Sequence, residues 1–307
     1  KKAIDFLINA SGSRRNLEID FFGGEPLLNM KTVSEIISYA REKEERYNKK
    51  FRFTITTNAL LLNSENIDYI NKNMNNVVLS IDGRKEVNDC MRIKVDGSGT
   101  YDNIIEKIKR IAESRNQDNY YVRGTFTRNN LDFSKDVLHL ANEGFKQVSV
   151  EPVVAQDGSG YEIKENDLNT LFNEYEKLAL EYVNKRKEGK AFNFFHFMID
   201  LEQGPCVLKR LAGCGSGYEY LAVSPEGDLY PCHQFVGMED FKMGNVSTLE
   251  DKGLNQEIQS QFMNSNIYTK DECRKCWAKF YCSGGCAANA YQFNKNINIP
   301  YKIGCEL

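Results

Sequence analysis

The sequence lacks long apolar runs, internal repeats and a strong net charge. No run approaches the roughly 18–20 apolar residues that a helix needs to span a bilayer, so we expect no membrane-spanning helix. A formal net charge of −3 argues against a general binder of nucleic acid or membrane surfaces. Low-complexity segments and solenoid repeats are absent. With 41% hydrophobic and 27% charged residues, the 307-residue chain has an ordinary globular composition.

Cysteine is scarce in one part of the chain and abundant in the other. Cys90 is the one cysteine before residue 206, whereas eight lie from Cys206 onward. The chain opens at Lys1, not Met, on a helical pattern, so we expect that it begins inside a larger protein.

The first 155 residues repeat one rhythm of a β-rich run, a turn and a helical stretch. Helical patterns lie near residues 31–47, 63–73, 100–116 and 132–144. The β-rich runs between them are Leu17–Phe22, Phe51–Thr57, Val77–Ile81, Tyr120–Phe126 and Val148–Val154. Such alternation predicts an α/β fold with a parallel sheet or barrel.

Two short motifs follow strands of this predicted sheet. They are Gly23-Gly24-Glu25-Pro26 and Ser80-Ile81-Asp82-Gly83. Ligands of parallel α/β sheets bind at the carboxyl ends of the strands, so both motifs are candidates for a binding site.

The second part begins with a charged periodic stretch near residues 163–190, which predicts a long surface helix. Farther on, Tyr220–Val223 and Asp228–Tyr230 read as a β-hairpin in which Gly227 supplies the tight turn.

The cysteine spacing carries the strongest chemical signal. Cys214 is followed by x12-Gly-x4 and Cys232, and Cys273-x2-Cys276-x5-Cys282-x3-Cys286 precedes Cys305. A disulfide framework suits small secreted domains, and this chain reads as a large α/β enzyme. Structural zinc also uses four-cysteine sets with a Cys-x2-Cys knuckle. Iron–sulfur clusters are the third interpretation, and the full spacing with the α/β context favours them.

The whole spacing resembles that of the SPASM domain of radical SAM enzymes, and Gly23–Pro26 resembles the GGEP motif of the same superfamily. The resemblance implies a partial (β/α)6 radical SAM barrel at residues 1–160, a helical linker at 161–205 and a SPASM domain at 206–307. One departure is clear: the Cys-x3-Cys-x2-Cys motif that binds the catalytic cluster is absent. We expect that motif, and the first barrel strand, to lie upstream of Lys1; without them the chain could not be expected to cleave SAM.

The resemblance also implies which residues hold the cofactors, S-adenosylmethionine (SAM) and 4Fe–4S clusters. Cys273, Cys276, Cys282 and Cys305 would hold an outer auxiliary cluster. Cys214, Cys232 and Cys286 would hold an inner one, with Cys206 as the candidate fourth ligand. Alternatively, the fourth iron site could stay open for a substrate thiolate.

The SAM-binding residues implied by the resemblance are Gly23, Gly24, Glu25, Ser80 and Arg92. The glycine backbone and Glu25 would receive the ammonium of SAM, because glycine lets a ligand approach the backbone closely. Ser80 would contact the ribose or the carboxylate. Arg92, in an Asp-x2-Arg pattern, suits a carboxylate. Simple turns at both motifs and a surface ion pair at Arg92 are the structural alternatives.

SPASM enzymes mostly modify peptides, and two subgroups compete here. Sulfatase-maturing enzymes, which oxidise Cys or Ser to formylglycine, typically place an Asp after the cysteine equivalent to Cys232, where this chain has His233. The stretch from Gly213 to Phe235 looks like maturases of cysteine-rich SCIFF peptides. Those enzymes form thioethers between a Cys sulfur and an acceptor residue such as Thr. A non-catalytic two-cluster electron-transfer protein is a third interpretation.

The thioether interpretation implies further partners and a setting. The partners would be a ribosomal cysteine-rich precursor peptide and an electron donor such as flavodoxin or ferredoxin, with no nucleic acid and no membrane. Because exposed clusters are oxygen-sensitive, we expect an anaerobic cytoplasm. Cys90, His139 and His196 read as structural residues, whereas His233 follows a cluster ligand and could face the active site.

Overall fold

The computed structural model describes residues 1–156, 158–199, 202 and 211–307, and its contacts divide the chain into two compact units. The first unit comprises Lys1, Leu7–Val153 and Asn166–Ile199. The second comprises Lys2–Phe6, Val154–Glu165 and Asp200–Leu307. In the described residues, no helix is both long enough and apolar enough to cross a membrane.

The first unit is built on a six-stranded sheet in which every pair of neighbours is parallel. Its strands, in spatial order, are β1 (Asn16–Phe21), β2 (Lys50–Thr57), β3 (Asn76–Ser80), β4 (Tyr120–Phe126), β5 (Gln147–Pro152) and β6 (Asn193–Phe194). The predicted α/β fold with a parallel sheet is therefore confirmed. All five predicted strands are present, and β6 is an additional strand of two residues.

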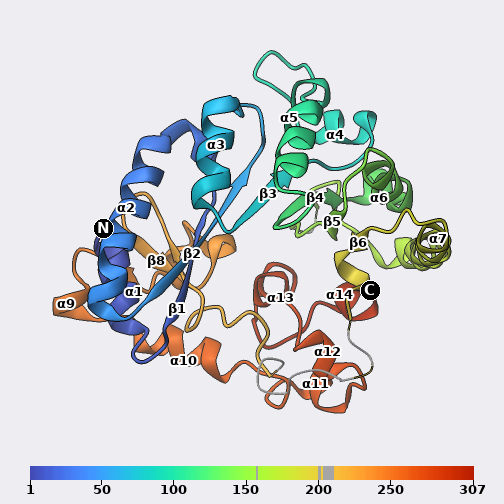
Figure 1. The fold of residues 1–307 in the computed structure, drawn as a ribbon. Coiled ribbons are helices and arrows are strands. Elements are labelled where there is room, and N and C mark those ends of the chain that lie inside the picture. Colours follow the sequence, from blue (N-terminus) through green and yellow to red (C-terminus); the bar gives the residue numbers. More distant parts are fainter. Residues whose placement is uncertain (157, 200–201, 203–210) are drawn as a thin grey trace. The chain divides into compact units, whose positions relative to one another are not determined.

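Helices connect the strands of this sheet and lie on its outer side (Figure 1). They are α2 (Met30–Tyr47), α3 (Ser64–Asn73), α4 (Lys85–Met91), α5 (Tyr101–Ser114), α6 (Phe133–Asn142) and α7 (Leu168–Lys187). A further helix, α1 (Lys2–Ala10), begins in the second unit and precedes β1. The sequence predicts all of them except α4. Although α7 lies in the predicted linker 161–205, its contacts with α6 assign it to the sheet unit.

Side chains alternate between the two faces of the sheet. Phe51, Phe53 and Ile55 of β2 are fully buried, whereas Arg52 and Thr54 between them are exposed or half-buried. The same alternation holds along β3 and β4. An apolar face is thus covered by the helices, and the polar face remains for ligands.

The second unit contains a three-stranded antiparallel sheet of β7 (Ala222–Val223), β8 (Asp228–Tyr230) and β9 (Gly244–Asn245). The predicted hairpin is β7–β8, and Gly227 closes its turn with a φ of 85°. A core that includes Leu229, Phe235, Phe241 and Phe262 packs beside it. The helices of this unit are short: α9 (Leu249–Lys252), α10 (Gln256–Asn264), α11 (Asp271–Lys275), α12 (Lys279–Cys282), α13 (Ala287–Asn294) and α14 (Lys302–Glu306).

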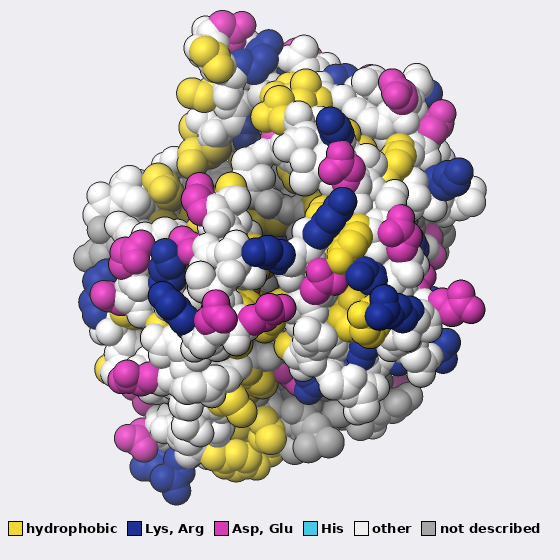
Figure 2. Space-filling view, turned by 90° about the vertical axis from the view of Figure 1, so that its left-hand side faces the viewer, with side chains coloured by type: hydrophobic (Ala, Val, Ile, Leu, Met, Phe, Trp, Pro, Cys, Tyr) yellow, Lys and Arg dark blue, Asp and Glu magenta, His cyan; other side chains and the backbone are white. Residues whose placement is uncertain are grey.

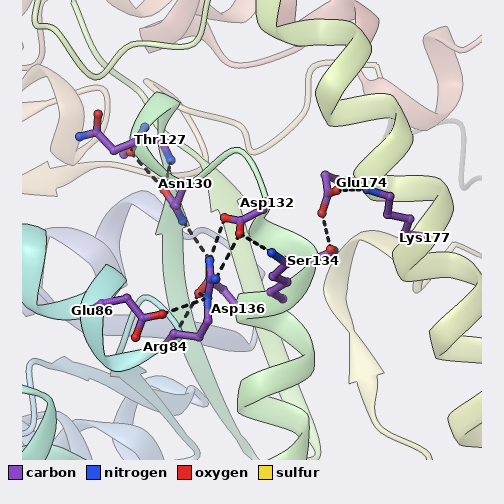
Figure 3. A network of polar contacts seen from close by, with 11 residues as sticks. Arg84, Glu86, Thr127, Asn130, Asp132, Ser134, Asp136, Glu174 and Lys177 are labelled. Atoms are coloured by element: carbon purple, nitrogen blue, oxygen red, sulfur yellow. Dashed lines mark hydrogen bonds and ion pairs between the residues drawn. The ribbon is translucent and has the colours of Figure 1, made fainter.

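A buried ion-pair network ties the loop after β3 to α6 (Figure 3). Arg84 donates from Nε to Asp136 Oδ1 at 2.8 Å and from Nη2 to Asp132 Oδ1 at 2.8 Å. Asp136 is fully buried and also accepts from Asn130 Nδ2 at 3.1 Å. This network fixes the loop that carries the Ser-Ile-Asp-Gly motif.

Replacing Asp136 by Asn should destabilise the first unit by about 3–5 kcal/mol, because breaking a buried pair leaves its partner's charge uncompensated. Glu86→Gln is the matched control, since Glu86 lies 3.9 Å from Arg84 and is largely exposed. Its cost should stay within about 1 kcal/mol. Urea unfolding of both variants measures the difference, and equal stabilities would refute the structural role.

Asp132 gives this network a pH dependence. The hydrogen bond from Arg84 lowers the pKa of Asp132, against the opposing effect of burial. A lowered pKa contributes stability that is present above the unfolded value, near about 4, and is lost as pH falls through the folded value. The stability gap between wild type and Asp132→Asn should therefore hold between about pH 5 and 7 and shrink below about pH 4. A gap that grows on acidification in urea unfolding would contradict this.

Candidate functional site

The GGEP loop follows β1 directly, and its glycines are needed for their backbone geometry. Gly23 and Gly24 have φ values of 87° and 53°, which favour glycine, and both are exposed with open space where a Cβ would lie. Their backbone groups are therefore accessible to a ligand.

The Glu25 carboxylate is already occupied by neighbouring protein groups. Its Oε1 accepts from Thr57 Oγ1 at 2.8 Å and from the Leu27 amide at 3.0 Å, while Oε2 accepts from the Asn58 amide at 2.8 Å. These bonds fasten the GGEP loop to the end of β2. The side chain thus shapes the loop, and the contact of the glycine backbone with an ammonium group stays a prediction.

The Ser80 motif lies at the end of β3, beside β4. Ser80 is half-buried, and the next amide, Ile81, donates to the Arg123 carbonyl at 3.0 Å. Gly124 of β4 must be glycine, because an added Cβ would come within 2.6 Å of the Ile81 carbonyl oxygen. This close approach holds the two strand ends together.

Asp82 of the same motif positions Arg92. The carboxylate of Asp82 accepts from Arg92 Nε at 2.7 Å and from Nη2 at 2.9 Å, and it also accepts from the Thr125 amide at 2.9 Å. Asp82 is 3% exposed, so the guanidinium is held in a bidentate pair at the carboxyl ends of β3 and β4. Arg92 thus forms an ion pair, but with a residue of the motif and not with a distant surface group.

Asp89 of the Asp-x2-Arg pattern has a structural role. Its Oδ1 accepts from the amides of Thr100 and Tyr101, both at 2.8 Å, and so satisfies the amino end of α5. Asp89 is thus bonded to the protein backbone through that oxygen, and Arg92 stays the predicted carboxylate contact of this pattern.

A polar cavity of about 290 Å³ opens at the opposite ends of the strands. Glu18, Arg52 and Asn76, near the amino ends of β1, β2 and β3, are among its lining residues. The motifs lie at the carboxyl ends, where ligands of parallel sheets bind, so we place the site there and not in this cavity.

A series of hydrogen-bonded polar side chains that includes Glu151 of β5 was not predicted from the sequence. His196 contacts Glu151 Oε2 through Nε2 at 2.8 Å and the Tyr175 hydroxyl through Nδ1 at 2.9 Å. Burial is the largest influence on Glu151 and pushes its pKa up, but the hydrogen bond and charge of His196, the hydrogen bond from Ser149 and the charge of Arg123 together lower the pKa. The predicted structural role of His196 agrees with this network, as does the contact of His139 with the Tyr101 hydroxyl at 2.7 Å.

Neighbouring charges indicate which cysteines of the second unit influence one another. The pKa of the Cys232 thiol is raised to about 11, mainly by burial, with contributions from the charges of Cys286 and Cys214. Burial likewise raises the pKa of Cys305 to about 11, and the charges that add to it include Cys282, Cys273 and Cys276. The charges that raise the pKa of each of these two thiols thus include those of other cysteines of its predicted set.

Neighbouring thiols are compatible with cluster ligation, and the two four-cysteine sets stay a prediction. The described cysteines form no disulfide, and no three described His, Cys, Asp or Glu side chains are grouped as ligands of one metal ion. Cys206 lies outside the described residues. Cys90 is exposed on α4, in the first unit.

His233 follows the predicted ligand Cys232 within a short 3-10 turn. Its Nδ1 lies 3.3 Å from the hydroxyl of Tyr220, the residue at which the predicted hairpin begins.

Comparison with known families agrees with these features. Residues 10–136 match the radical SAM superfamily, and residues 214–277 match the iron–sulfur cluster-binding SPASM domain. The chain therefore contains a radical SAM domain followed by a SPASM domain, which together imply SAM and 4Fe–4S clusters as cofactors.

Several characterised relatives are peptide-modifying or other radical SAM enzymes. The cysteine-type anaerobic sulfatase-maturating enzyme of Clostridium perfringens is 24% identical over 280 residues, which are 87% of this chain and 72% of that enzyme. The radical SAM cyclopropyl synthase TigE of Paramaledivibacter caminithermalis is 23% identical over 100% of this chain. The chain spans 61% of the length of TigE and 62% of an uncharacterized Archaeoglobus fulgidus protein that is 26% identical over 88% of this chain.

Solved structures share the fold. Native anSMEcpe with bound AdoMet and the Kp18Cys peptide has a TM-score of 0.75 at 20% identity, covering 99% of this chain and 84% of that one. Streptococcus suis SuiB bound to S-adenosylmethionine has a TM-score of 0.59 at 18% identity, covering 99% and 69%.

Proposed function

We propose that this protein is a radical SAM peptide maturase that forms thioether crosslinks in a cysteine-rich precursor peptide. His233 carries the choice. The position after Cys232, where sulfatase-maturing enzymes typically place an acidic base, holds an imidazole beside the Tyr220 hydroxyl. The resemblance of residues 213–235 to thioether-forming maturases supports the same choice.

In this proposal the first unit binds SAM at the strand ends. The backbone of Gly23 and Gly24 accepts the ammonium group, and Ser80 contacts the ribose or the carboxylate. Arg92 donates from Nη1 to the carboxylate, because Asp82 holds its other edge in place. Glu25 contributes by fixing the loop.

The second unit would hold two auxiliary clusters on the cysteine sets defined above. Cys206 would complete the inner set, or the fourth iron site would stay open for a substrate thiolate. When bound, the clusters and SAM supply one-electron chemistry. The reaction would balance as follows: a sulfur–carbon bond forms, the hydrogen atom of the broken C–H bond is taken up by the deoxyadenosyl group derived from SAM, the S–H proton goes to solvent, and the remaining electron goes to an auxiliary cluster.

The test is incubation of the complete, cluster-loaded enzyme, including the Cys-x3-Cys-x2-Cys segment expected upstream of Lys1, with SAM, a reductant and a cysteine-rich precursor peptide. We expect a mass loss of about 2 Da per crosslink, with loss of the alkylatable thiol, because the nucleophilic sulfur is now bonded to carbon. Unchanged peptide mass while SAM turns over would refute the proposal. A flavodoxin or ferredoxin should replace the chemical reductant.

Formylglycine formation is the second candidate, and the 24% identity to the C. perfringens sulfatase-maturating enzyme favours it. The same incubation separates the two, because formylglycine is an aldehyde that condenses with a hydrazide and a thioether is not. A modified peptide that forms a hydrazone would favour formylglycine. Clusters without peptide modification would favour a non-catalytic electron-transfer role.

We expect a partner other than nucleic acid, because the net charge of the chain is small and negative. On the face drawn in Figure 2, Lys and Arg side chains are interspersed with Asp and Glu. This pattern matches the small net charge of −3. Operation in an anaerobic cytoplasm is part of the proposal.

A further inference from the structure

Lys270 is a buried lysine among the cysteines of the second unit. It is 4% exposed and directly precedes α11, which carries Cys273. Lysine is almost never fully buried unless it is paired. The burial of Lys270 therefore needs a physical explanation, which an exposed lysine would not need.

The ammonium of Lys270 lies against the loop that joins the two cysteine sets. Lys270 Nζ donates to the Gly284 carbonyl at 2.9 Å, and a Cβ added to Gly284 would come 3.7 Å from that nitrogen. Gly284 lies between Cys282, a ligand of the outer set, and Cys286, a ligand of the inner set. The ammonium is thus bonded to the segment that lies between the two sets in the sequence.

One carbonyl does not balance a buried ammonium. In the part of the chain that the structure describes, no Asp or Glu forms an ion pair with Lys270. Burial lowers the pKa of Lys270, and the charges of Cys273, Cys282, Cys286 and Cys305 oppose that lowering. Burying an unpaired charge costs several kcal/mol, roughly, even after relaxation. A charged Lys270 would therefore be compensated by thiolates of the proposed cluster ligands.

We propose that Lys270 is the shared counter-charge of the two auxiliary cluster sites and raises their reduction potentials. This inference rests on the ligand assignment in the proposed function. Each reduction adds one electron from the reductant to a thiolate-bound cluster and makes it more negative. A fixed positive charge nearby favours that reduced state.

The effect should be larger at the outer set. Lys270 directly precedes α11, which carries Cys273 of the outer set, and its Nζ bonds the carbonyl of Gly284, which follows Cys282 of the same set. Lys270 is therefore a positioning and charge-setting residue, not a catalytic one, and its signature is a potential.

The experiment is a redox titration of the reconstituted holoenzyme, followed by electron paramagnetic resonance. Lys270→Gln keeps a donor for the Gly284 carbonyl and removes the charge. We expect its outer cluster to be about tenfold harder to reduce, a downward shift of about 59 mV for a one-electron couple. Lys270→Arg should restore the wild-type value within twofold. Lys275→Gln, on the exposed side of α11, is the matched control and should leave it unchanged.

Wild-type potentials in Lys270→Gln with full iron would overturn the proposal. If Lys270→Gln loses iron while Lys270→Arg keeps it, the requirement for charge is supported. Equal iron loss in both variants would mean a steric role and would also overturn it. Iron content tests the ligand assignment, and the mass of the peptide tests the proposed function. A failure of either of these proposals can therefore be told apart from a failure of the proposal for Lys270.

Discussion

Replacing Arg92 by Met should weaken SAM binding to the holoenzyme by about 10- to 100-fold, because a hydrogen bond to a charged group contributes about 1.5–3 kcal/mol. Asp82 is almost fully buried, so the same variant also leaves its carboxylate without the bidentate partner. Equilibrium dialysis with labelled SAM measures the Kd.

Two controls separate binding from folding at this position. Arg110→Met removes an exposed arginine from α5 and should leave the Kd unchanged. Arg92→Lys keeps the charge but not the fork, so it should bind SAM with intermediate affinity. An unaltered Kd in Arg92→Met, with wild-type thermal stability, would show that Arg92 does not contact the ligand.

Replacing a single cysteine should remove the cluster of its own set and leave the other cluster in place. Cys305→Ala should reduce the iron bound by the second unit from about eight to about four atoms and spare the inner cluster, since each cubane cluster needs its own thiolates. Cys232→Ala should spare the outer one. Cys90→Ala, on α4 of the first unit, is the control and should keep all the iron.

Iron quantification with electron paramagnetic resonance of each variant tells the two clusters apart. Loss of all the iron from every variant, or an equal loss of both signals, would argue against two independent sets. Loss of only about one iron atom from Cys232→Ala would instead point to a cluster held by fewer cysteines than proposed.

The sheet was predictable because its signals are local. Runs such as Phe51–Thr57 are long enough to show strand composition, and each is followed by a turn and a helical period. The last strand, Asn193–Phe194, has two residues and carries no period of its own. It exists because it pairs with Gln147–Val148 of β5, which is a tertiary contact. The third strand of the small sheet, Gly244–Asn245, escapes prediction for the same reason.

The candidate site, too, was predictable from the sequence only in part. The motif spacing marks Gly23, Ser80 and the cysteines, but not what their neighbours do. Glu25 reads from the sequence as a ligand contact, and its carboxylate is engaged by Thr57, a residue 32 positions away. Lys270 reads as an ordinary charged residue, since only the fold reveals its burial beside Gly284. Gly124 in a strand is the one sequence signal that could have indicated the close approach to Ile81.

The most direct test of this account is Mössbauer spectroscopy of the chain reconstituted with isotopically enriched iron, with zinc measured in the same sample. The account predicts cubane clusters only, with about eight iron atoms per chain and no stoichiometric zinc. About two zinc atoms and no bound iron would contradict it, because the cysteine sets would then be structural zinc sites.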